Sequence, residues 1–467
     1  MSEPQPAMAP DLVRLLSILL AGLATATWSR AAADGPYELS STWRVGAAQH
    51  VECRLQVGGD LRLATDGQPR QIPMSVVAEI GYDEKLLELV PGRKGRLRSI
   101  RYFDQADAVI KVDKGGAKPT LRDHVRVVVV QSEAQQITMF SPHGPLTRDE
   151  LDLIELPFDS LLLARLLPEH PVTVGQAWEH SADVMAALLG LDAASHCAVE
   201  SVLGEVTDAM ATVALAGTVH GAVQGVATEL ELKGTYQFDR DLGQITRLTV
   251  AFEERRSIGH VGPGLDVGAK IQLRITPIDR ADRLDRETPS VTAAGNPDQL
   301  RLLYESRQSG FQVTHDRRWH LTADEARLAV LRLVDRGELI AQCQVAPVAS
   351  KSPDRLIDLE AYQKDVRYAL GDHFGQVVQA TEWRDARGSQ VLRVRVKGQV
   401  EALPIEWRYY LIAHESGRRV ALAFTVEESL LAQFGDADLT LVRSIEFVPP
   451  APDGRLETGS RPGDATR

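Results

Sequence analysis

The sequence predicts an α+β protein with two domains, each a mainly antiparallel β-sheet with packed helices. Between residues 38 and about 278, apolar and polar residues alternate with a period of two, which is typical of half-buried strands. Because an antiparallel sheet tolerates one solvated face, this alternation favours antiparallel pairing. Residues 279–298 have dense charge followed by Pro, Thr, Ala and Gly, which predicts a linker. Residues 299–449 then mix strand and helix periods, so we expect a second domain there.

The first domain is expected to span residues 34–278. Its strands are predicted from apolar residues that alternate with polar ones, at Val51, Cys53, Leu55 and Val57, over 74–80, over 229–238 and over 245–253. A helical insert divides these strands. Thr147 and Glu150 have the spacing of a capping box, and Ser181 can cap a helix over 182–189 that ends at Gly190. Pro157 and Pro168 bracket a third predicted helix over 158–167.

The N-terminus has the pattern of a signal peptide over residues 1–33. The apolar stretch Leu15–Thr27 is too short to cross a bilayer, which needs about 20 residues. The small residues Ala31–Ala33 follow it, so we expect cleavage between Ala33 and Asp34. The mature chain is then expected to be periplasmic or extracellular and to have no transmembrane span. The alternative is an uncleaved N-terminal anchor. Residues 450–467 are predicted to be a disordered tail.

In the second domain, a hairpin is predicted over 331–341 with Arg336-Gly337 in its turn. Leu359, Tyr362, Val366 and Leu370 have helical spacing, which predicts an amphipathic helix over 358–373. Further strands are expected at about 376–384, 390–398, 405–413 and 419–427, then a short helix at 435–443 and a closing strand at 444–448.

The second domain resembles the PsbP-like superfamily, which is named for an extrinsic photosystem subunit and includes a Ran-binding nuclear import factor. The resemblance rests on Gly310-Phe-Gln-Val-Thr followed by Arg318-Trp-His-Leu, and on the late segments Trp407-Arg-Tyr-Tyr-Leu, Arg419-Val-Ala-Leu-Ala-Phe-Thr and Val442-Arg-Ser-Ile-Glu-Phe. It covers about a third of the chain. It implies an antiparallel sheet flanked by helices and a non-catalytic binding or assembly role, and it implies no active-site residue.

The order of elements in the first domain is weakly similar to that of exported half-barrel proteins of the lipoprotein-carrier type, a similarity that rests on analogy alone. The 158–167 segment has apolar side chains around most of its circumference. These are Leu161, Leu162, Leu163, Leu166 and Leu167. Two interpretations follow: a helix buried on two sides, or a lid over an apolar cavity.

No motif of a known catalytic or nucleotide-binding site is present, so we predict no catalytic, cofactor-binding or metal-binding residue and no cofactor. His50 and Glu52 share the polar face of a predicted strand, but a zinc site needs three or four ligands. The net charge of −12 argues against nucleic-acid binding. The three cysteines occupy apolar positions, and a Cys53–Cys197 disulfide is one option that the pattern leaves open.

The sequence therefore favours an exported, non-catalytic binding or assembly protein of the cell envelope, whose partner is an unknown protein or an apolar small molecule. One alternative is a carrier of an apolar ligand such as a lipid. Another is a hydrolase in the first domain, in which distant acids converge with a histidine. Candidates for such a site are Asp149, Asp152, Glu155, His143 and His170.

Overall fold

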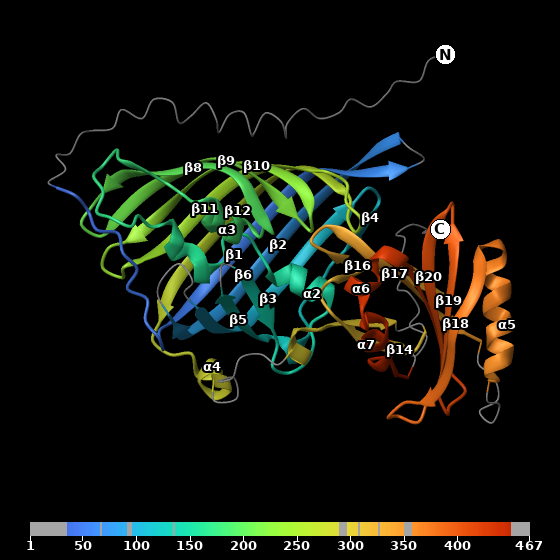
Figure 1. Ribbon diagram of the computed structural model, residues 1–467. Helices are drawn as coiled ribbons and strands as arrows, with labels where there is room; N and C mark the ends of the chain where they lie inside the picture. Colours follow the sequence, from blue (N-terminus) through green and yellow to red (C-terminus); the bar gives the residue numbers. More distant parts are fainter. Residues whose placement is uncertain are drawn as a thin grey trace, which may run out of the picture.

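The computed structural model describes residues 35–65, 68–90, 96–133, 136–288, 297–306, 309–325, 327–349 and 357–449 (Figure 1). The predicted signal peptide with its cleavage site and the predicted tail at 450–467 lie outside these residues. The described chain is mostly antiparallel β-sheet, arranged in three sheets of 12, seven and three strands. No helix in the described ranges is long and apolar enough to cross a membrane.

The 12-stranded sheet consists of two meanders that join at its centre, where β1 pairs with β12. Its strands are β1 (Ala48–Thr65), β2 (Gln68–Leu89), β3 (Leu97–Val112), β4 (Gly115–Ala117), β5 (Val127–Glu133), β6 (Gln136–Phe140), β7 (Ala177–Glu179), β8 (Ala193–Val206), β9 (Met210–Val223), β10 (Val226–Asp239), β11 (Gln244–Arg256) and β12 (Gly264–Ile278). Figure 1 shows this sheet curving around the helical insert. The face toward the insert is called the inner face below, and the opposite face the outer face.

Three short helices cover part of the inner face: α2 (Arg148–Ile154), η2 (Ser160–Leu166) and α3 (Ala182–Leu189). The predicted caps are confirmed, since Thr147 and Glu150 form a capping box and Ser181 accepts a hydrogen bond from the backbone N–H of Val184. The segment predicted as a helix over 158–167 is a 3₁₀-helix over Ser160–Leu166 instead. Successive side chains of a 3₁₀-helix point in three directions, and Leu161, Leu162 and Leu163 are all buried, so the segment is covered on more than one side. One further 3₁₀ turn, η1 (Asp123–Val125), precedes β5.

The seven-stranded sheet contains β15 (Trp319–Glu325), β16 (Leu328–Asp335), β17 (Glu338–Val348), β18 (Phe374–Arg384), β19 (Gln390–Val400), β20 (Leu403–Ala413) and β21 (Arg419–Glu427). Helix α5 (Leu359–Leu370) packs on one face and is followed by η5 (Gly371–His373). The other face packs against η6 (Glu428–Leu430), α6 (Leu431–Phe434), α7 (Ala437–Arg443) and the three-stranded sheet of β13 (Leu302–Ser306), β14 (Phe311–His315) and β22 (Glu446–Phe447). The predicted order of strands and helices from residue 331 onward is confirmed.

Part of the predicted linker is folded onto the 12-stranded sheet. Helix α4 (Asp282–Glu287) places Leu284 in a small buried cluster with Ile100 and Phe140, and Lys85 pairs with Asp285. The sequence predicts a flexible linker there, because a single leucine among charged residues gives little indication that the segment is buried. The rest of the segment, 289–296, lies outside the described residues, and η4 (Pro297–Leu300) follows it.

Several polar contacts join the large sheet and its helices to the later strands. The backbone N–H of Leu303 donates to the carbonyl oxygen of Leu146 at 2.8 Å. The Arg148 side chain donates to the carbonyl oxygen of Arg317 at 2.6 Å, and the Arg317 side chain in turn donates to the carbonyl oxygen of Met139. The sheets therefore contact each other through backbone groups as well as side chains.

Candidate functional site

A buried polar network fixes η2 to the inner face of the large sheet. The Glu84 carboxylate, fully buried, accepts hydrogen bonds from Gln49, Ser99, Arg101 and Ser160 at 2.7–2.8 Å. The Arg101 guanidinium also makes a two-pronged contact with Asp159, at 2.8 and 2.6 Å. Because every charge in this network has a partner, the network holds η2 in one orientation and exposes no reactive group.

This network also positions the five leucines of the 158–167 segment, for which burial on two sides and a lid were the two interpretations. Leu161, Leu162, Leu163 and Leu166 are at most 2% exposed, and Leu167 is half-buried against the same core. These positions fit the interpretation of a segment buried on two sides. None of the five leucines lines the apolar recess described next.

The apolar recess lies on the inner face where the helical cover ends, and its cavity volume is about 220 Å³. One wall is formed by Leu189 and Leu191, at the end of the helical insert, and by Pro157, between α2 and η2. The strands supply the floor with Leu55, Val57, Met74, Val76, Leu230, Phe252, Leu265, Val267 and Ala269, and with the rim residues Glu254 and Arg256.

Exposure along the strands shows that the apolar inner face continues beyond its cover. On β1, Val51 and Cys53 are buried, whereas the next inner positions, Leu55 and Val57, are only half-buried. On β2, Ala78 is buried and Val76 is half-buried. The alternation that builds the core therefore extends past the last helix, and it leaves apolar side chains that this part of the chain does not fully cover.

The rim of the recess carries a charge pair. The Arg256 guanidinium contacts the Glu254 carboxylate at 2.5–2.8 Å, and Glu254 is only 9% exposed. The Arg62 side chain donates to the carbonyl oxygen of Arg256 at 2.6 Å. The charges of Glu254 and Arg256 neutralise each other, and the Arg62 guanidinium adds a positive charge beside this pair.

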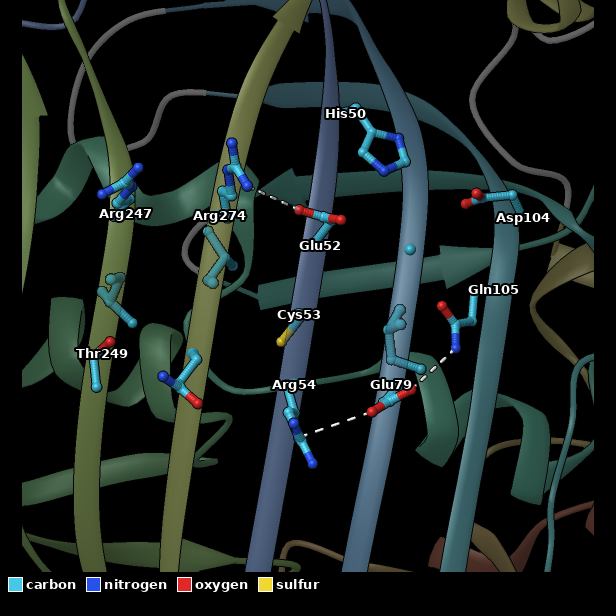
Figure 2. Close-up of a pocket in the computed structure, with 15 residues that line it drawn as sticks. His50, Glu52, Cys53, Arg54, Glu79, Asp104, Gln105, Arg247, Thr249 and Arg274 are labelled. Atoms are coloured by element: carbon cyan, nitrogen blue, oxygen red, sulfur yellow. Dashed lines mark hydrogen bonds and ion pairs between the residues drawn. The ribbon is translucent and has the colours of Figure 1, made fainter.

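The outer face of the same sheet holds a larger, open and polar groove of about 510 Å³ (Figure 2). Opposite charges pair across its strands, with Arg54 and Glu79 at 3.8 Å and Arg274 and Glu52 at 4.0 Å. All four of these side chains are more than half exposed. Such pairs are typical of the solvated face of an antiparallel sheet, and each contributes little to the stability of the fold.

His50 and Glu52 lie on this outer face, as predicted. The Nδ1 atom of His50 contacts an Asp83 oxygen at 2.8 Å, so its partner is Asp83 rather than Glu52. Among the described residues, no group of three or more His, Cys, Asp or Glu side chains is placed to hold a metal ion.

Two of the five residues suggested for a hydrolase pair with residues outside that set. His143 contacts Glu287 at 3.1 Å, and Asp152 lies 3.8 Å from Arg148 in an ion pair within α2. His170 is exposed in the loop between η2 and β7. These contacts do not form the convergent histidine and carboxylate site that a hydrolase would need.

Sequence reasoning missed a buried serine–histidine contact. The Nε2 atom of His180 lies 2.7 Å from the Ser201 hydroxyl, which also lies 3.2 Å from the Tyr236 hydroxyl. Ser201 is fully buried and His180 is 7% exposed, and burial lowers the pKa of His180 to about 4. A nucleophile must reach its substrate, so this pair is interpreted as structural. Only the pairing of β7 with β8 could have revealed it.

All three cysteines are free thiols, so the Cys53–Cys197 disulfide is not formed. Burial raises the pKa of Cys53 to about 12 and also raises the pKa of Cys197. Cys343 is fully buried, as its apolar position predicted. His196 and Cys197 point to opposite faces of β8: His196 is exposed, and the Cys197 thiol contacts the carbonyl oxygen of His180.

No protein-family model and no curated protein matches the chain. Among solved structures, it is similar in part to a cyanobacterial PsbP from Synechocystis sp. PCC 6803, with 16% identity over 34% of this chain and 99% of that one, at a TM-score of 0.26. It is also similar to the Ran-binding protein Mog1p from Saccharomyces cerevisiae, with 13% identity over 32% of this chain and 95% of that one, at a TM-score of 0.26.

A third similarity, to lipovitellin, covers 55% of this chain and 27% of that one, with 10% identity and a TM-score of 0.27. These are weak, partial neighbours. At TM-scores this low, none of them assigns a function to the chain.

Proposed function

We propose that this chain is an exported, non-catalytic binding protein, and that the recess of the large sheet holds an apolar group of its ligand. The observation that carries the proposal is the extension of the apolar inner face beyond its helical cover, at Leu55, Val57 and Val76. When a ligand covers these side chains and removes them from water, the complex is stabilised by about 25 cal/mol per Å² of apolar surface buried. The N-terminal sequence pattern supports export of the mature chain.

The size of the recess limits what it can hold. Sites that enclose a whole drug-sized ligand have volumes of about 300–1,000 Å³, and this recess has about 220 Å³. It therefore fits one apolar part of a larger molecule, such as an acyl segment or an apolar side chain. The Glu254–Arg256 pair at the rim offers polar contacts to the part that stays outside. This arrangement favours an amphiphilic ligand.

Two adjacent valines give a matched test of binding. Val76 lines the recess, and Val77, the next residue of β2, is 37% exposed on the outer face. We expect the fluorescent fatty acid cis-parinaric acid to bind the purified mature chain. Val76→Glu should abolish this binding because a carboxylate in the recess must be desolvated. Val77→Glu should leave it unchanged.

Circular dichroism and thermal melting of both variants identify any loss of fold. Absence of probe binding, or equal loss in the two folded variants, would contradict the proposal. Export is tested separately by N-terminal sequencing of protein recovered outside the cytoplasm, where we expect Asp34 as the first residue. Recovery of Met1 there would show that the leader is not removed.

A further inference from the structure

Two histidines face each other on the outer face of the large sheet. His196 on β8 and His220 on β9 are cross-strand partners, and their ring centroids are 5.3 Å apart. Both side chains are exposed. Among the described residues, none makes a hydrogen bond to a ring nitrogen of His196 or to a ring nitrogen of His220. Each neutral imidazole has one unprotonated ring nitrogen, so the two neighbouring histidines offer two ligand atoms to an external ion.

The two strands that carry these histidines, β8 and β9, are closely paired at this point. A β-bulge lies between Ala194 and His196, and the Ser195 hydroxyl donates to the carbonyl oxygen of His220 at 3.2 Å. Two glycines of β9 lie near His220, Gly221 next to it and Gly217 three residues before it. A Cβ on Gly221 would lie 2.5 Å from the carbonyl oxygen of Ala193, and one on Gly217 would lie 2.0 Å from that of Ala198. The two strands therefore approach each other more closely than side chains at these positions would allow, which limits the relative movement of the histidines.

The charges on the neighbouring strand favour a cation. Glu229 on β10 is the cross-strand partner of His220, and Glu231 lies on the same face two residues further along. Both are exposed. Arg255, the partner of Glu229 on β11, lies one strand further from the histidines. Two carboxylates near the imidazoles lower the electrostatic cost of placing a divalent ion there.

We propose that His196 and His220 form a two-histidine clamp for a divalent transition-metal ion, with water completing its coordination. Imidazole nitrogen is a good ligand for copper and nickel. The exposed rings can rotate toward the ion without breaking an existing hydrogen bond. With two protein ligands, the ion is expected to exchange with solvent. The clamp lies on the face opposite the recess, so it does not depend on the proposed function.

The test is calorimetric titration of the full mature chain, free of any affinity tag, with Cu²⁺ or Ni²⁺. We expect one ion per chain and tighter binding of Cu²⁺ than of Ni²⁺. His196→Ala and His220→Ala should each lower the affinity by at least about tenfold. Glu229→Gln should have a smaller effect because it removes only a nearby charge. Ni²⁺ should also raise the melting temperature of the parent chain but not that of His220→Ala.

His50→Ala is the matched control, since His50 lies on the same face of the sheet and is paired with Asp83. This variant should bind the metal as the parent chain does. Failure of the parent chain to bind at millimolar metal, binding that survives His220→Ala, or loss of binding in folded His50→Ala would each overturn the proposal.

Discussion

Gly225 and Gly337 meet in a contact between two hairpin turns, and a Cβ built on Gly225 would lie 2.0 Å from the Cα of Gly337. Gly225 lies between β9 and β10 of the large sheet, and Gly337 lies between β16 and β17 of the seven-stranded sheet. Both have positive φ, at 72° and 84°, and each follows a residue that also has positive φ. Such turns match the twist of a hairpin. The glycines therefore serve both the turn conformation and the contact between the sheets.

Gly225→Ala should destabilise the protein in two ways. Alanine at positive φ costs about 1–2 kcal/mol, and its Cβ would also push the Gly337 turn away. Gly388→Ala is the control, because Gly388 has a φ of 82° with no atom close to an added Cβ. Thermal melting should show a larger decrease for Gly225→Ala. Equal decreases would mean that the contact between the turns contributes no stability.

Arg101→Met should be strongly destabilising, because it leaves the buried Glu84 and Asp159 carboxylates without their shared cation. Breaking a buried ion pair in this way typically costs about 3–5 kcal/mol. The exposed pair of Arg54 and Glu79 offers the contrast, and Arg54→Met should cost at most about 1 kcal/mol. Urea unfolding of both variants measures the difference. A similar small cost for both would show that the buried network does not stabilise the fold.

The pKa of His180 predicts a loss of stability in mild acid. Burial lowers this pKa to about 4 in the folded chain, whereas an unfolded histidine has a pKa of about 6.5. Between pH 7 and pH 5 the unfolded chain therefore binds a proton that the folded chain does not, which lowers the free energy of unfolding by about 2 kcal/mol.

Urea unfolding at the two pH values should show this loss in the parent chain and a smaller loss in His180→Gln. The exposed His170→Gln serves as control and should retain the full loss. An unchanged pH dependence in His180→Gln would contradict the assignment.

Two residues of helix α5 allow a matched test of which face of the helix is buried. Val366 is 3% exposed against the seven-stranded sheet, and Tyr368, two residues later, is 91% exposed. Val366→Asp should lower the free energy of unfolding by several kcal/mol because it buries an unpaired carboxylate. Tyr368→Asp should have little effect. Denaturation of both variants provides the comparison, and tolerance of Val366→Asp would show that α5 does not pack as described.

The division of the chain into two domains joined near residues 279–298 remains a prediction. Because α4 buries Leu284, we expect the first proteolytic cut after Glu287, between residues 288 and 298. Limited proteolysis with mass spectrometry of the products should then yield two resistant fragments. A first cut within 38–278 would place the boundary elsewhere.

The sequence by itself determined the features that depend on near neighbours. Period-two alternation placed β1 and β2, Thr147 and Ser181 marked the starts of two helices, and Arg336-Gly337 marked a hairpin turn. Each of these signals acts within a few residues along the chain, so side-chain spacing and capping chemistry suffice to predict it.

Only the tertiary structure decided where distant segments meet. In the 158–167 segment, Asp159 and Ser160 are held by Arg101 of β3 and Glu84 of β2, which lie far away in sequence. The recess needs the end of α3 beside strands far away in sequence, and the histidine clamp needs the bulge at Ser195 to bring His196 opposite His220. Strand register and the extent of helical cover follow from long-range packing, and a change of one residue in register would turn each of these side chains to the other face.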